Sequence, residues 1–199
     1  MFVFIRLIIG GAIGLVWFVL MNNKTVNKRK NIIISFVIAV IICLSYLWPF
    51  ENYFITFDSP KTAYEYYVGP KDSDIKLIIE GKNSDLIIST QNQYTVIPKT
   101  NEGWKIGVGT DLKTVTQKIV DGVVIYVHQY RNTNDYYISV FDTNGEECDV
   151  ADIYKSEFIP SMEHYAPSKT TVVTYYANIQ EFNGEYWIRI NDNEVRFSE

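Results

Sequence analysis

The stretch "KTVTQKIVDGVVIYVHQY", residues 113–130, places two runs rich in β-branched and aromatic residues on either side of an Asp-Gly pair. Asp121 and Gly122 suit a two-residue turn between antiparallel strands, because both residue types accept positive φ. In the second run apolar side chains alternate with tyrosine and histidine, as in a strand with one buried face. We therefore predict an antiparallel β-hairpin here.

Similar patterns extend outward from this hairpin. Short β-type runs alternate with turn residues from position 75 to the end, and a second hairpin is predicted at Asn183-Gly184. About nine strands joined locally indicate antiparallel meanders. "GVGT", residues 107–110, is interpreted as a turn because it lacks the lysine of a phosphate loop. The segment 145–170 is the least regular and is a candidate functional loop.

One helix is predicted before the strands. Ser59 suits the N-cap and Pro60 the first helical position, while Gly69 and Pro70 end the helix. Three of its residues share one face at helical spacing and are expected to pack on the core: Ala63, Tyr64 and Tyr67.

The first 50 residues differ from the rest of the chain. Residues 3–20 contain one charge, Arg6, and residues 32–48 contain none. Runs of about 18 or more apolar residues are long enough to cross a bilayer. We predict two transmembrane helices, 3–20 and 32–49, that are retained rather than cleaved as a signal peptide.

The connector between these runs, residues 21–31, carries four basic side chains and no acidic one. Short loops rich in Lys and Arg stay in the cytoplasm. The prediction is therefore a cell-membrane protein with two spans and an extracytoplasmic domain, 51–199. The predicted fold class is a membrane α-helical hairpin followed by a mainly antiparallel β domain with one amino-terminal helix.

Small residues indicate how the two predicted spans pack. Gly10 and Gly14 are four residues apart, as are Ala39 and Cys43. In an antiparallel hairpin Gly14 lies level with Ala39, and Gly10 with Cys43, so that the backbones approach closely. Self-association of two chains through the glycines is the alternative.

Charge excludes one class of partner. Residues 51–199 contain 13 basic and 23 acidic side chains, a net charge of −10. Nucleic acid requires a basic face, so we expect no nucleic-acid binding. The two cysteines, Cys43 and Cys148, provide no disulfide framework.

Catalytic motifs are absent from the sequence: it contains no nucleophile elbow, zinc-protease, phosphate-loop, dinucleotide-binding or Cys-x-x-Cys motif. We predict no cofactor and no enzymatic activity. The acidic segment around "FDTNGEECDVAD" (141–152) offers oxygen ligands for calcium, and the candidate metal residues are Asp142, Glu147 and Asp149. Its spacing does not match the EF-hand loop, and a plain turn is the alternative.

Tyrosine is unusually abundant, with fifteen residues and three doublets. A doublet in a strand sends one ring to each face of the sheet. Half-buried packing explains some of these rings. The others predict a binding face, because tyrosine supplies rigid amphipathic contact area, and the candidate binding residues are Tyr126, His128, Tyr130, Tyr136 and Tyr175.

Residues 57–106 resemble uncharacterised membrane-anchored proteins of Gram-positive bacteria. The similarity lies in an "SP-x-x-A" helix, an "IIEG" strand end and a "PKT-x-x-GW" hairpin. It covers about a quarter of the chain and includes no catalytic residue. The resemblance implies an extracytoplasmic domain of unknown function.

Three functions follow from these patterns. The first is a non-enzymatic membrane-anchored protein whose surface domain binds a protein partner or a cell-surface ligand, with the lipid bilayer as its other partner. The second is a structural subunit of a larger membrane complex that assembles through the transmembrane helices. The third is a surface hydrolase or metal-dependent enzyme that uses Glu163 and His164 or the acidic segment.

Overall fold

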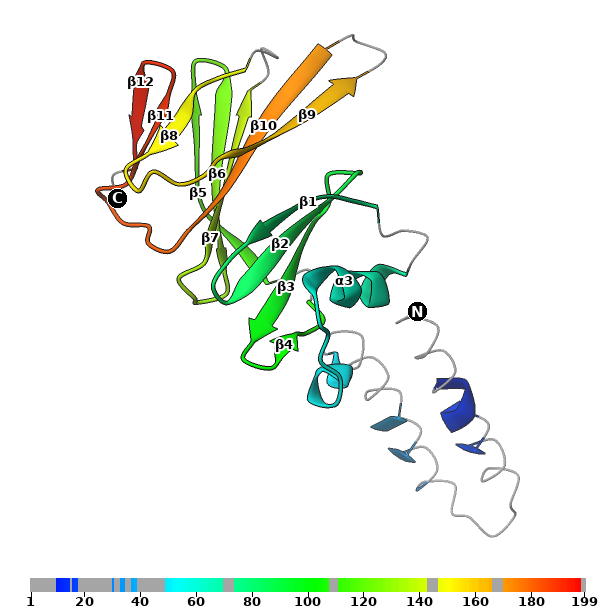
Figure 1. Cartoon of the computed structure of the whole chain (residues 1–199). Coiled ribbons are helices and arrows are strands. Elements are labelled where there is room, and N and C mark those ends of the chain that lie inside the picture. The colour runs from blue at the N-terminus through cyan, green and yellow to red at the C-terminus, as the bar shows by residue number, and fades with distance from the viewer. Residues whose placement is uncertain are drawn as a thin grey trace.

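The structure of the chain is a computed structural model, and it describes residues 10–14, 16–17, 30, 33–34, 37–38, 49–69, 74–107, 111–142, 147–165 and 170–197. From residue 49 onward the described chain is mostly antiparallel β-strand, arranged in three sheets (Figure 1). The helices in this part are short: the 3-10 helix η1 (Phe50–Tyr53) and the α-helix α3 (Pro60–Val68).

The predicted membrane hairpin is not found. Within the described residues, no helix combines the length and the apolar character that crossing a membrane requires. A span needs about 20 apolar residues in one helix. The prediction of two spans is therefore wrong, and with it the cell-membrane location and the extracytoplasmic placement of 51–199.

The predicted packing seam between the spans is untested. Gly10 and Gly14 belong to a described helical stretch. Ala39 and Cys43 lie outside the described residues, as does most of the basic connector 21–31. The structure therefore gives no contact between these four positions.

Helix α3 begins and ends as its sequence predicts. The Ser59 side chain accepts a hydrogen bond from the Thr62 amide, and the Thr62 hydroxyl caps the Ser59 amide in return. Pro60 is the first helical residue, and Gly69, with φ of 96°, ends the helix. Of the predicted core residues, Ala63 and Tyr64 are buried and Tyr67 is half-buried.

The first sheet has the order β1-β2-β3-β4. Every residue of its inner strand β2 is buried, because both faces of the strand are covered. Ile87 and Ile97 pack with α3, whereas Leu86, Ile88 and Val96 pack against the second sheet. The strands are β1 (Ile75–Glu80), β2 (Ser84–Ser89), β3 (Tyr94–Thr100) and β4 (Gly103–Trp104).

The second sheet has the order β5-β6-β7-β10-β9, with every pair antiparallel. The predicted hairpin at its start is confirmed: Val120 pairs with Val123, and Asp121 and Gly122 take φ of 49° and 84°. The strands are β5 (Leu112–Val120), β6 (Val123–Tyr130), β7 (Tyr136–Asp142), β9 (Ile159–Tyr165) and β10 (Thr170–Ile179).

A third sheet, β12-β11-β8, packs against one face of the second sheet. We call the cluster of buried hydrophobic side chains between the second and third sheets the second core. It contains residues from both sheets, including Ile125, Val140, Ile188 and Val195. The other face of the second sheet packs on the first sheet, so the second sheet lies between the other two (Figure 1). The strands are β8 (Val150–Asp152), β11 (Trp187–Ile190) and β12 (Asn193–Arg196).

The predicted hairpin at Asn183-Gly184 is wrong. The strands on its two sides, β10 and β11, belong to different sheets and are joined by a loop. Tyr186 explains the departure, since its ring is fully buried in the second core and its hydroxyl donates to Asp152 at 2.9 Å. Burying this ring outweighs the local preference of Asn-Gly for a tight turn. The irregular segment 145–170 contains the strands β8 and β9.

Candidate binding groove

Two of the five predicted binding residues lie inside the protein. Tyr130 is 3% exposed and Tyr175 is 5% exposed. The Tyr175 hydroxyl accepts a hydrogen bond from the Cys148 amide at 2.7 Å. Burial raises the pKa of Tyr130 to about 12 and also raises that of Tyr175. Both phenols therefore stay neutral and contribute to packing rather than to an outer surface.

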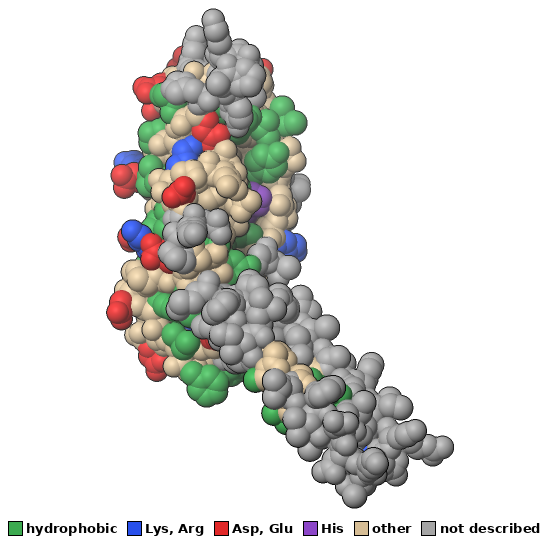
Figure 2. Space-filling view, turned by 90° about the vertical axis from the view of Figure 1, so that its right-hand side faces the viewer, with side chains coloured by type: hydrophobic (Ala, Val, Ile, Leu, Met, Phe, Trp, Pro, Cys, Tyr) green, Lys and Arg blue, Asp and Glu red, His purple; other side chains and the backbone are tan. Residues whose placement is uncertain are grey.

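Two others join a row of rings on the face of the second sheet that meets the first sheet. We call this the aromatic row: Tyr94, Tyr126, His128 and Tyr176. The Tyr126 and His128 rings stack with their centres 5.8 Å apart and an angle of 9°. The Tyr94 ring approaches His128 and Tyr176 edge-on, at 6.3 and 6.1 Å. Figure 2 shows histidine, in purple, at the surface beside hydrophobic side chains in green.

The imidazole of His128 is half-buried and lies beside Thr114. Burial lowers its pKa below the ordinary value of 6.5, so the ring is neutral at pH 7. Its Nδ1 lies 3.1 Å from the Thr114 hydroxyl. Within the described chain no carboxylate hydrogen-bonds to the ring, so the third member of a catalytic triad is missing there.

The fifth predicted residue, Tyr136, lines a separate groove of about 410 Å³ at the edge of the second core. We call it the aromatic groove. The Phe182 ring lines this groove and packs on Tyr136 and Phe197, with ring centres 5.7 and 5.6 Å apart. The described lining contains no acidic, basic or histidine side chain, and it includes Val115, Thr116, Gln129, Tyr136, Phe182 and Phe197.

Local structure shapes the two sides of the aromatic groove. On one side β5 has a bulge, where the register shifts between Thr114 and Thr116. The bulge leaves Val115 unpaired with β6 and 40% exposed, and such bulges re-aim a side chain. On the other side is the loop of Asn183 and Gly184 that connects β10 to β11.

Hydrogen bonds fix the polar groups of the aromatic groove. The Gln129 carboxamide donates to the Thr133 carbonyl at 2.9 Å and to the Tyr136 hydroxyl oxygen at 3.1 Å. Tyr136 accepts this bond, and its own O–H proton has no acceptor among the described residues. The groove therefore presents a positioned hydroxyl donor beside aromatic rings.

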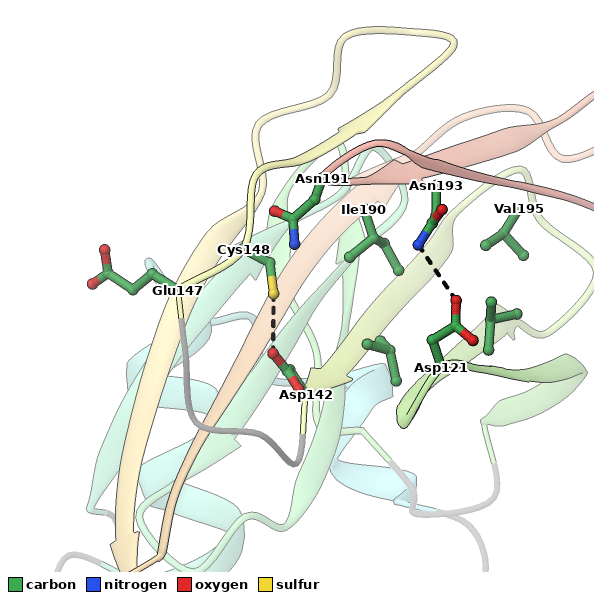
Figure 3. Close-up of a pocket in the computed structure, with 10 residues that line it drawn as sticks. Asp121, Asp142, Glu147, Cys148, Ile190, Asn191, Asn193 and Val195 are labelled. Atoms are coloured by element: carbon green, nitrogen blue, oxygen red, sulfur yellow. Dashed lines mark hydrogen bonds between the residues drawn. The ribbon is translucent and has the colours of Figure 1, made fainter.

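The three predicted metal ligands do not converge. Asp142 is buried and accepts a hydrogen bond from the Cys148 thiol at 3.0 Å, at one side of a second cavity of about 140 Å³ (Figure 3). The Glu147 side chain points away from that cavity (Figure 3). Asp149 is exposed and lies 4.0 Å from Arg189. Within the described residues no three His, Cys, Asp or Glu side chains come together as metal ligands.

Glu163, one of the two residues suggested as an acid–base pair for an enzyme, connects two sheets through its hydrogen bonds. Glu163 accepts hydrogen bonds from Lys76 and from Asn92, both at 2.6 Å, and so joins β9 to the first sheet. His164 is the next residue of β9, where its backbone pairs with Thr171. The structure describes the backbone of His164 and not its side chain, so the suggested pair is untested.

Sequence reasoning missed the rings that complete both aromatic sites. Tyr94 and Tyr176 belong to different sheets, and Phe182 and Phe197 lie in a loop and at the end of β12. No local pattern marks these residues. No protein-family model matches the chain, and no significant match is found among curated proteins or solved structures.

Proposed function

We propose that the described β domain is a non-enzymatic binding module, and that its ligand occupies the aromatic groove. The observation that supports this proposal is the groove itself. Its volume of about 410 Å³ lies in the usual range of ligand sites, which combine aromatic walls with a few placed polar groups. Tyr136, Phe182 and Gln129 supply this combination.

The chemistry of the described side chains favours binding over catalysis. Thr114 and His128 form a hydroxyl–imidazole pair, with 3.1 Å between the Thr114 hydroxyl and His128 Nδ1. The Cys148 thiol donates to the Asp142 carboxylate, and a neighbouring carboxylate disfavours the thiolate that a nucleophile needs. Neither pair lines the aromatic groove.

The groove lining also selects the charge of the ligand. A charged group loses hydration when it is buried, and it regains that energy only from a charged or strongly hydrogen-bonding partner. The described lining has no charged side chain. The ligand is therefore uncharged where it contacts the groove.

Small probes test this proposal without knowledge of the natural ligand. The full chain, with ¹³C-labelled Tyr and Phe rings, is titrated with N-acetylprolinamide, cyclohexanol and methyl β-glucoside, and with acetate and ethylammonium as charged counterparts. We expect the neutral probes to shift Tyr136 and Phe182 signals, and the charged ones to leave them unchanged. Shifts confined to Tyr94 and Tyr126, or equal effects of charged probes, contradict the proposal.

Matched variants separate the two aromatic sites in the same titration. Phe182→Ala removes the lining ring that packs on both Tyr136 and Phe197, and the probe-induced shifts should disappear. Tyr126→Ala removes a ring of the aromatic row, about which the proposal makes no claim, and the shifts should remain. Tyr136→Phe keeps the ring and removes one hydroxyl, so it serves as the variant least able to disturb the fold.

A further inference from the structure

The Asn183-Gly184 pair is exposed in the loop between β10 and β11. Instead of a hairpin between two paired strands, the structure has a turn that extends to the buried Tyr186. The Tyr186 amide donates to the Asn183 carbonyl at 3.0 Å and so closes this turn. Both residues of the pair also line the aromatic groove. A chemical change at the pair would therefore alter the groove.

Hydrogen bonds hold the Asn183 side chain next to its own backbone. Its Oδ1 accepts from the Glu185 amide at 3.0 Å, and its NH₂ group donates to the Glu181 carboxylate at 2.9 Å. The bond from Glu185 closes a short ring of atoms that includes the peptide unit of Gly184. The side-chain amide of Asn183 is therefore folded back toward the Gly184 nitrogen.

The Gly184 nitrogen can act as a nucleophile toward this amide. Within the described residues its N–H has no hydrogen-bond acceptor. Glycine has no Cβ, so no side chain hinders the approach of the nitrogen to the Asn183 amide carbon. The Glu185 amide already donates to Asn183 Oδ1, and this bond stabilises negative charge that develops on the oxygen during the attack.

We infer that Asn183 is a site of spontaneous deamidation. The Gly184 nitrogen forms a bond to the amide carbon of Asn183 and gives up its proton. The bond between that carbon and the side-chain nitrogen breaks, and ammonia leaves with the proton. Water then hydrolyses the five-membered imide, which gives aspartate or isoaspartate at position 183. Water is the only other reactant, and nothing is oxidised or reduced.

The effect of this reaction on the aromatic groove rests on the proposed function. The product is ionised at pH 7, since the ordinary pKa of aspartate is about 3.9. It therefore puts a negative charge into a described lining that has none. Glu181 loses the donor at position 183 and gains a like charge beside it. A cation compensates these charges, so the deamidated groove accepts a cationic ligand.

Peptide mapping of the full chain by mass spectrometry tests the chemistry. The folded protein is incubated at pH 8 for several weeks, and isoaspartate is labelled with an isoaspartyl methyltransferase. Deamidation at Asn183 should increase with time. Asn178 should stay unchanged, because it lies in β10 and the β-branched Ile179 follows it. The map also separates Asn183 from Asn144, the other asparagine before a glycine.

Gly184→Ala is the matched variant for the reaction. Its methyl group hinders the approach of the nitrogen, and we expect deamidation at Asn183 to be about tenfold slower. This change corresponds to a barrier about 1.4 kcal/mol higher. An equal rate in the two proteins contradicts attack by the nitrogen of residue 184.

The ethylammonium titration tests the effect on the groove. This cation should leave the Tyr136 and Phe182 signals of the unmodified protein unchanged and should shift them in Asn183→Asp. Asn183→Gln keeps a neutral amide and should behave as the unmodified protein does. Both substitutions change an exposed side chain, and circular dichroism checks that both variants are folded.

The outcomes separate the inference from the proposed function. Retention of the Asn183 amide in the folded chain overturns the inference, whether or not the urea-unfolded chain loses that amide. The small-probe titration then decides the proposed function independently. Deamidation at Asn183 without a response of Asn183→Asp to ethylammonium supports the modification site and overturns its effect on the groove.

Discussion

The Asp135 carboxylate accepts a hydrogen bond from the backbone amide of Asn83 at 2.6 Å. The same carboxylate accepts from the Lys82 amide at 2.9 Å and from the Ser84 hydroxyl at 3.1 Å. Asp135 ends the turn between β6 and β7, whereas Lys82 and Asn83 lie in the turn between β1 and β2 and Ser84 is the first residue of β2. One fully buried side chain thus fastens the first sheet to the second.

Asp135→Ala should destabilise the protein strongly. The substitution leaves the amides of Lys82 and Asn83 without their acceptor, and breaking a buried charged network costs about 3 kcal/mol. The free energy of unfolding from a urea titration measures the loss. Asp192→Ala, at an exposed turn position, is the control and should change that free energy by less than about 0.5 kcal/mol. Equal effects of the two variants contradict the role given to Asp135.

The doublet Tyr136-Tyr137 gives a second prediction, because its two phenols have different surroundings. The Tyr137 ring is 1% exposed, and its hydroxyl donates to the Ser84 carbonyl at 2.9 Å. Tyr137→Phe should lower the free energy of unfolding by about 1–2 kcal/mol, since the buried Ser84 carbonyl and the Ser84 hydroxyl each lose one hydrogen-bond partner. Tyr136→Phe should lower it by less than about 0.5 kcal/mol, because that phenol is partly exposed. Thermal unfolding of both variants checks the order, and the reverse order contradicts it.

This doublet also shows which features of the fold could be predicted from the sequence. Strand geometry correctly predicts that the two rings point to opposite faces, and the alternation around Asp121-Gly122 correctly predicts a hairpin. Asn183-Gly184 has the same local signal and forms no hairpin. The difference is tertiary, since only the folded chain reveals that Tyr186 belongs to the second core.

A third prediction concerns the pH dependence of the free energy of unfolding. Burial lowers the pKa of His128 in the folded protein, so protonation favours the unfolded chain, whose histidine titrates near 6.5. The stability that this group contributes is therefore present above about pH 6.5 and is lost as the pH falls through the lower folded pKa. Wild-type protein should lose more stability between pH 7.5 and pH 5 than His128→Gln.

The control for this titration keeps the neighbours of the imidazole. Glutamine retains a hydrogen-bonding group beside Thr114 and does not titrate. Urea midpoints of the two proteins are compared at each pH, so that the contributions of the other titrating groups, which both proteins share, cancel. If the two curves stay parallel down to pH 5, the folded pKa of His128 is not lowered.

A fourth prediction tests the packing of β3 against the loop after β4. A Cβ added at Gly107 would lie 1.7 Å from the Val96 carbonyl oxygen, so the backbone must move to accept a side chain. Gly107→Ala should cost more than about 2 kcal/mol of unfolding free energy. Gly184→Ala is the control, since that residue is exposed. Urea titration of both variants measures the difference, and a neutral Gly107→Ala variant contradicts the close approach.

The candidate site was less accessible to sequence reasoning than the fold. Abundant tyrosine directs attention to aromatic rings, yet period-2 counting cannot tell which face is covered by another sheet. Tyr130 and Tyr175 are buried for this reason. The aromatic groove combines Tyr136 with Phe182 and Phe197, which are 46 and 61 positions later in the chain, and only the packing of the third sheet brings them together.

A crystal structure of the full chain with N-acetylprolinamide tests the central claim most directly. The account predicts the probe in the aromatic groove, with its ring on Phe182 and an acceptor oxygen within hydrogen-bond distance of the Tyr136 hydroxyl. A structure with the probe on Tyr94 and Tyr126 instead, and the aromatic groove free of it, contradicts the account.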